Sequence, residues 1–97
     1  AWAARLDASP HKAEFLRRMA GDLPADFSLG AHIAGLIAAP QKIATRKASE
    51  IALAALNPVL PDTIGGSADL TGSNNTLAGG IGTFNRDNYA GRYVYYG

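Results

Sequence analysis

The chain has 97 residues, which suits one small domain with a limited capacity to bury apolar surface. Its formal net charge of +1 indicates neither a nucleic acid nor an anionic membrane surface as a partner. The absence of cysteine excludes disulfides and thiolate metal sites and fits the cytoplasm, and no apolar run could span a bilayer.

Both ends of the sequence resemble cuts through a longer polypeptide. The chain begins at Ala1 without an initiator methionine, and it stops at Gly97 just after the β-prone run 93–96. Such a run normally leads into another element. We therefore expect this sequence to be a piece of a larger protein.

A first helix is expected from Ser9-Pro10, because serine can cap a helix and proline fits its first turn. Gly21 is a suitable terminator for this helix. Arg17 and Arg18 are better explained as a solvated basic face than as a binding patch. The apolar stripe at helical spacing consists of Phe15, Leu16, Met19 and Leu23.

A second, weaker helix is predicted after the break at Leu23–Asp26, with Gly30 and Gly35 lowering its stability. Ala38-Ala39-Pro40 marks a boundary, since the residue before proline resists helical geometry. The segment before this boundary is typical of a linker made of short helices. Its second helix has an apolar side formed by Leu29, Ile33, Leu36 and Ile37.

The third helix has the strongest pattern and is predicted from Ile43 to Leu56, ending at Asn57-Pro58. A short strand is expected around Thr63-Ile64, followed by a turn at Gly65–Ser67. The composition then becomes rich in Gly, Ser, Thr and Asn up to residue 82, which predicts a loop. A further strand is predicted at residues 92–96.

No catalytic or metal-binding set emerges from the spacing of the residues. His11 and His32 each stand alone, without a second ligand at metal-binding spacing. No Ser-His-Asp set, Walker pattern or dinucleotide fingerprint can be assembled. We therefore expect neither a catalytic residue nor a metal ligand within this chain.

Arg46, on the third helix, is a candidate for binding phosphate. Its guanidinium offers a planar fork of donors that matches phosphate oxygens. The alternative is an ion pair with Glu50 one helical turn further on, in the less favoured order. Spacing alone leaves both interpretations open.

Ser73 and Asp69 are two further candidates in the polar loop. Ser73 follows Gly72, which lets the backbone approach a ligand, and its hydroxyl and the nearby N–H groups could bind an anion. Asp69 follows the predicted strand, where open α/β sheets tend to place ligands. The alternatives are an ordinary polar turn for Ser73 and a cap or turn acceptor for Asp69.

Several runs of the sequence, in their order, resemble the transketolase family. The resemblance covers nearly the whole chain, and its most diagnostic runs are Lys42–Ser49 (KIATRKAS) and Gly65–Thr71 (GGSADLT). It also includes Ala13–Met19 (AEFLRRM), Leu23–Phe27 (LPADF) and Asn88–Gly97 (NYAGRYVYYG).

The resemblance implies an α/β fold: a fragment of a thiamine diphosphate-binding fold, with linker helices followed by a helix and strands of an incomplete, mainly parallel sheet. Residues 1–40 would end the diphosphate-binding domain and form the interdomain linker. Residues 41–97 would be the N-terminal part of the pyrimidine-binding domain. The parent enzyme is then expected to transfer a two-carbon ketol unit from a ketose phosphate to an aldose phosphate.

The resemblance also implies roles for single residues. Arg46 and Ser73 match the residues that bind the phosphate of the sugar substrate, and Asp69 matches an aspartate that supports cofactor binding. The cofactor of the whole enzyme would be thiamine diphosphate with Mg²⁺ or Ca²⁺, held between the subunits of a homodimer. This chain lacks the glutamate that activates the cofactor, the Gly-Asp-Gly metal motif and the catalytic histidines, so we expect it to hold no cofactor and to be inactive alone.

Two alternatives remain at this point. A dihydroxyacetone synthase has similar motifs and uses formaldehyde as the acceptor. An independent, non-catalytic phosphate-binding or scaffold module would have the same local features. As a fragment of a transketolase, the piece should be poorly stable alone, because its sheet lacks most partner strands.

Overall fold

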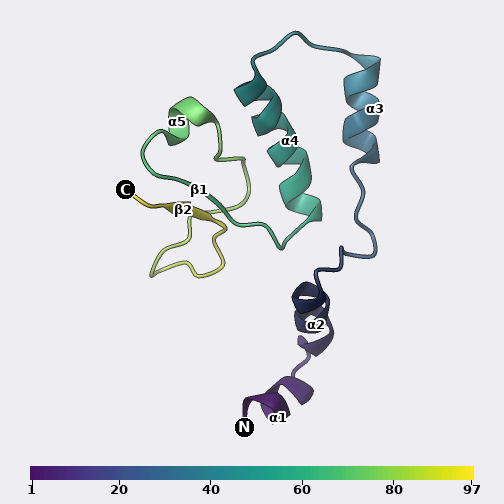
Figure 1. Ribbon diagram of the computed structural model, residues 1–97, viewed down its shortest axis with the longest axis vertical. Helices are drawn as coiled ribbons and strands as arrows, with labels where there is room; N and C mark the ends of the chain where they lie inside the picture. The colour runs from purple at the N-terminus through teal and green to yellow at the C-terminus, as the bar shows by residue number, and fades with distance from the viewer.

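Five helices and two short strands follow one another along residues 1–97, all of which are described by the computed structural model (Figure 1). The helices are α1 (Trp2–Asp7), α2 (Lys12–Ala20), α3 (Gly30–Ala38), α4 (Thr45–Val59) and α5 (Thr71–Asn74). The strands are β1 (Gly65–Ser67) and β2 (Tyr93–Tyr95).

The elements are spread out rather than packed around one centre. Helix α4 lies between α3 on one side and the strands with α5 on the other, while α1 and α2 extend away from them (Figure 1). The radius of gyration is 16.6 Å, against about 12.5 Å for a compact domain of this length. The exposed surface is 7061 Å², where a closed protein of this mass exposes about 5,300 Å².

Helix α2 confirms the first predicted helix and its end, but it begins at Lys12 with His11 at the N-cap, so the predicted start at Ser9-Pro10 is wrong. Gly21 adopts φ +79°, and its N–H donates to the Arg18 carbonyl at 3.1 Å. The Asp22 N–H donates to the Arg17 carbonyl at 3.1 Å, which completes a Schellman motif. The Ser9 hydroxyl oxygen accepts the N–H of His11 at 3.1 Å, just before the helix begins.

Helix α3 confirms the second predicted helix, and it ends at Ala38 before Ala39-Pro40. Helix α4 differs from its prediction at both ends, because it starts at Thr45 and continues through Pro58 to Val59. The expected stop at Asn57-Pro58 is therefore wrong. Pro58 lacks the N–H that would donate to the carbonyl of Ala54, so the helix loses one hydrogen bond. Ala54 is exposed, and water can bind its carbonyl instead, so the helix can continue.

The two strands pair in parallel, with Gly65 opposite Tyr93 and Ser67 opposite Tyr95. This confirms the parallel sheet and the strand predicted within residues 92–96. The first strand, however, is formed by Gly65–Ser67 itself, so the turn predicted there and the strand at Thr63-Ile64 are wrong.

Position 66 in β1 requires glycine because there is no room for a side chain between β1 and the segment that contains β2. A Cβ atom at Gly66 would lie 2.5 Å from the carbonyl oxygen of Val94 and 2.7 Å from the hydroxyl of Tyr96. Glycine thus permits a close approach of the strands here, which composition alone does not distinguish from a turn.

Two helices were not predicted. Helix α1 packs the ring of Trp2 edge-on against Phe15 of α2, with 6.3 Å between the ring centroids. Helix α5 is a single turn within the segment predicted as a loop. None of the helices is both long and apolar enough to cross a membrane.

Candidate functional site

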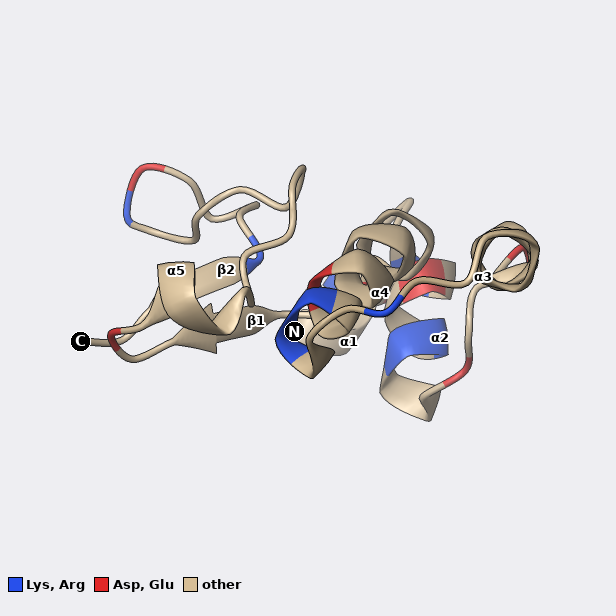
Figure 2. Cartoon of the chain, turned by 90° about the horizontal axis from the view of Figure 1, so that it is seen from above, with Lys and Arg blue, Asp and Glu red and all other residues tan.

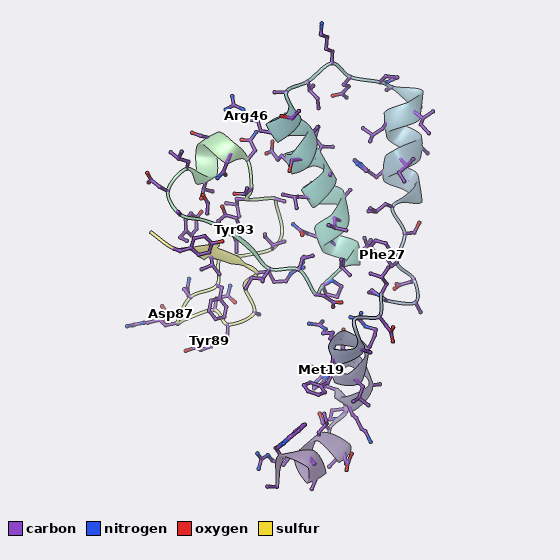
Figure 3. All side chains as sticks on the ribbon, in the orientation of Figure 1. Met19, Phe27, Arg46, Asp87, Tyr89 and Tyr93 are labelled. Atoms are coloured by element: carbon purple, nitrogen blue, oxygen red, sulfur yellow. The ribbon has the colours of Figure 1, made fainter.

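Arg46 lies in the first turn of α4 and points toward α5 (Figure 3). Its Nη1 donates a hydrogen bond to the main-chain carbonyl of Ser73 at 3.1 Å. The alternative pairing with Glu50 is wrong, because Glu50 instead binds Lys47 at 2.7 Å. Arg46 forms no ion pair and is exposed, so the rest of its donors remain free for a ligand.

The position of Arg46 is not explained by the stability of α4. The first turn carries no acidic residue, and it holds both Arg46 and Lys47. Cations at a helix N-terminus oppose the macrodipole, which favours anions there. The free guanidinium and the helix end therefore act together to favour an anion near this turn.

Ser73 lies in α5, where its backbone and its side chain have different roles. The N–H groups of Ser73 and Asn74 both donate to the carbonyl of Leu70 at 2.9 Å. These two N–H groups are therefore already hydrogen-bonded, so the prediction that nearby N–H groups could bind an anion is wrong for them. The exposed Ser73 hydroxyl remains as a donor for a ligand.

A network of hydrogen bonds holds the segment that carries Ser73. The hydroxyl of Tyr93 lies 2.9 Å from Thr71 Oγ1 and 2.7 Å from Thr76 Oγ1. The Asn74 amide donates to Ser67 Oγ of β1 at 2.9 Å. No local pattern indicates this network, because Tyr93 lies 17 residues or more from Thr71 and Thr76 along the chain.

Asp69 lies two residues beyond β1, as predicted, and its carboxylate is exposed. It forms no hydrogen bond and no ion pair, so the structure does not join it to Arg46 or Ser73. No group of three or more His, Cys, Asp or Glu side chains is placed to hold a metal ion. Asp69 therefore offers one free acceptor rather than a metal site.

A cavity of about 290 Å³ lies between α4 and β1, apart from the three candidate residues. Its lining contains no charged side chain, and its apolar part is formed by Leu53, Ile64 and Ile81. Such a lining does not suit a phosphate group. The candidate anion site is instead on the open surface between α4 and α5.

A separate ionic cluster joins α2 to the segment after α4, and Figure 2 shows the charges that α2 carries. The Arg17 guanidinium binds Asp62 at 2.6 Å and Glu14 at 2.7 Å. Hydrogen bonds from Arg17 and Arg18 lower the pKa of Glu14 to about 2, and the bond from Arg17 also lowers the pKa of Asp62. The prediction of a solvated basic face is therefore wrong for Arg17, whose side chain is only 16% exposed.

Comparison with known proteins identifies the family. The family model for the transketolase pyrimidine-binding domain matches residues 41–97 of this chain. The chain belongs to the transketolase family. It is 50% identical to transketolase 1 of Escherichia coli over 99% of this chain, and 47% identical to a transketolase of Cereibacter sphaeroides over 100% of it.

Solved transketolases share the fold of this chain. A mutant transketolase from Pichia stipitis matches 99% of the chain with a TM-score of 0.77 and 36% identity. A transketolase from the same organism, in complex with sedoheptulose 7-phosphate, matches 98% with a TM-score of 0.72 and 38% identity. The chain is thus an α/β fragment of the transketolase thiamine diphosphate-binding fold, and it spans about 15% of the length of each of these relatives.

Proposed function

We propose that this chain carries the phosphate-binding part of a transketolase substrate site, formed by Arg46 and Ser73. The observation that supports the proposal is the hydrogen bond from Arg46 to the Ser73 carbonyl, which joins residues 27 positions apart. It holds the free donors of the guanidinium next to the residue that carries the hydroxyl. A phosphate oxygen fits both kinds of donor.

The parent enzyme would transfer a two-carbon ketol unit from a ketose phosphate to an aldose phosphate, in the cytoplasm and within the pentose phosphate pathway. Related transketolases have been solved in complex with sedoheptulose 7-phosphate and with fructose 6-phosphate. Arg46 would neutralise the terminal phosphate of such a sugar and fix the sugar's orientation. Binding at a distance from the reacting carbons contributes mainly to affinity and alignment.

The cofactor of the parent enzyme would be thiamine diphosphate with Mg²⁺ or Ca²⁺, which supplies the carbanion chemistry when bound. In this chain, the free carboxylate of Asp69 could accept a hydrogen bond from the cofactor. The chain contains no group of metal ligands. Residues 1–40 would then belong to the end of the diphosphate-binding domain and the linker, and residues 41–97 to the pyrimidine-binding domain. The remaining contacts would come from the rest of the enzyme and from a homodimer partner.

The test is Arg46→Ala and Ser73→Ala in the full-length enzyme. Each change removes donors to a charged ligand, so we expect KM for a phosphorylated ketose to rise about tenfold to a hundredfold. The kinetics of a non-phosphorylated ketose should change little. Steady-state assays with both substrates measure this difference.

Lys47→Ala is the matched control, because Lys47 is the neighbouring cation on α4 and is already paired with Glu50. It should change neither KM by more than about twofold, as expected for an exposed ion pair. Equal losses on the two substrates in the Arg46 and Ser73 variants would contradict the proposal, as would no loss on either.

A further inference from the structure

The hydroxyl of Tyr93 lies at the centre of the contacts that hold α5. Tyr93 is fully buried, with 0% exposure, and it belongs to β2. Figure 3 shows its side chain on the side of the sheet where α5 lies. Its hydroxyl lies between Thr71 Oγ1 and Thr76 Oγ1, at the two ends of the segment that contains Ser73.

The hydrogen bonds of this network have one possible direction. The N–H of Thr76 can only donate, so the Asn74 atom facing it at 3.3 Å must be the carbonyl oxygen Oδ1. The Thr76 hydroxyl, 2.8 Å from the same oxygen, must then donate its single hydrogen to it. Tyr93 must therefore donate to Thr76, and Thr71 must donate to Tyr93.

The chain of donors thus runs from Thr71 through Tyr93 and Thr76 to Asn74, whose amide donates in turn to Ser67 of β1. Every hydroxyl before Asn74 uses its one hydrogen. The four-residue helix α5 is too short to hold its shape by its own hydrogen bonds. Its position is therefore set by β1, β2 and the contact with Arg46.

We propose that Tyr93 is a positioning residue for the phosphate site: its hydroxyl fixes the segment 71–76 on the sheet, and thereby fixes Ser73 beside Arg46. The proposal rests on the proposed function of Arg46 and Ser73. Tyr93 itself does not touch the ligand, because its side chain is fully buried. Its effect on the substrate passes through α5.

The experiment compares Tyr93→Phe with the unchanged full-length enzyme. The variant keeps the buried ring and removes one donor and one acceptor. We expect KM for a phosphorylated ketose, and the inhibition constant of inorganic phosphate, to rise about fivefold to tenfold, as for the loss of one or two neutral hydrogen bonds. The value of kcat and the kinetics of a non-phosphorylated ketose should stay within about twofold.

Tyr89→Phe is the matched control, since Tyr89 is 76% exposed and its hydroxyl has no hydrogen-bond partner. It should leave every constant unchanged. A purely structural role for Tyr93 would lower the melting temperature or affect both substrates equally. Either result, without a selective loss for phosphate, overturns the proposal.

The direction of the network gives a second test that does not depend on the fold of the Tyr93 variant. Thr76→Val removes the acceptor of Tyr93 and a donor to Asn74, whereas Thr71→Val removes only a donor to Tyr93. Thr76→Val should therefore weaken phosphate inhibition more than Thr71→Val, and Thr76→Ser should restore it. Equal effects, or no rescue by serine, would contradict the direction and the proposal.

Failure of this inference is distinguishable from failure of the proposed function. If Arg46→Ala and Ser73→Ala weaken phosphate inhibition while Tyr93→Phe and Thr76→Val do not, the phosphate site stands and the positioning role of Tyr93 falls. If none of the four variants changes the inhibition, both proposals are overturned.

Discussion

At the scale of single residues, Arg92 shows how one side chain joins distant elements. Its Nη2 donates to the carbonyl of Asn57 at 2.7 Å, and its Nη1 donates to the carbonyl of Leu60 at 3.1 Å and to Thr63 Oγ1 at 2.9 Å. These carbonyls belong to the C-terminal end of α4, where the helix leaves them without intrahelical partners. Arg92, directly before β2, therefore caps α4 from the sheet.

Arg92→Ala should loosen this end of α4. Hydrogen bonds from a charged donor contribute about 1.5–3 kcal/mol, so local opening should become roughly tenfold to a hundredfold more frequent. The measurement is hydrogen exchange in the full-length enzyme, followed at the amides of Leu60 and Gly65, which donate to Leu56 and to Arg92 itself.

The control for this prediction is Arg86→Ala. The Arg86 side chain is 89% exposed and pairs only with its neighbour Asp87, so its loss should leave the exchange at Leu60 and Gly65 unchanged. An equal effect of the two substitutions would show that Arg92 does not cap the helix.

At the scale of elements, the pairing of β1 with β2 depends on one of two adjacent glycines. A Cβ at Gly66 would lie 2.5 Å from Val94 O, whereas the nearest atom to a Cβ at Gly65 is Tyr93 Cδ2 at 3.8 Å. The first distance requires the strands to move apart, and the second is an ordinary contact.

Gly66→Ala should therefore destabilise the sheet by about 1–3 kcal/mol, the usual cost of overpacking, while Gly65→Ala should be close to neutral. Hydrogen exchange at the Tyr96 amide, which donates to the Ser67 carbonyl at 3.1 Å, reports the pairing directly in the full-length enzyme. Similar exchange in the two variants would refute the steric explanation.

The helices of this chain could be predicted where their signals are local. Gly21 ends α2 because glycine readily adopts the left-handed conformation found there, and Pro40 limits α3. Both boundaries therefore follow from residues next to the helix ends. Helix α1 has no side-chain cap and only six residues, which leaves it without such a signal. The strand at Gly65–Ser67 was missed because it pairs with a segment 28 residues further along the chain, which the local composition does not indicate.

The candidate site was predictable to a similar extent. Residue chemistry and the family resemblance indicated Arg46 and Ser73, and the structure brings them into contact, although their binding role remains a prediction. The occupied amides of Ser73 and Asn74 and the network around Tyr93 could not be predicted. These features depend on how β2 packs against α5, which no local pattern encodes.

At the scale of the whole molecule, the uncovered surface governs stability. Only three apolar residues are buried, namely Ala78, Ile81 and Tyr93, while α3 exposes Ile33, Leu36 and Ile37. Burial of apolar surface is the main favourable term in folding. Here the buried apolar surface is too small to offset the loss of conformational entropy. The pair of Arg18 with Glu14 in the ionic cluster adds little, because both side chains are 45% exposed.

The isolated 97-residue chain should therefore unfold without a cooperative transition. Thermal unfolding followed by circular dichroism should give a broad, shallow slope, whereas the full-length enzyme, in which the rest of the protein can cover these surfaces, should give a sharp one. Small-angle X-ray scattering of the chain should give a radius of gyration above 16.6 Å, because helices without tertiary partners fray. A sharp transition of the monomer above about 50 °C, in the range of ordinary stable domains, would contradict this prediction.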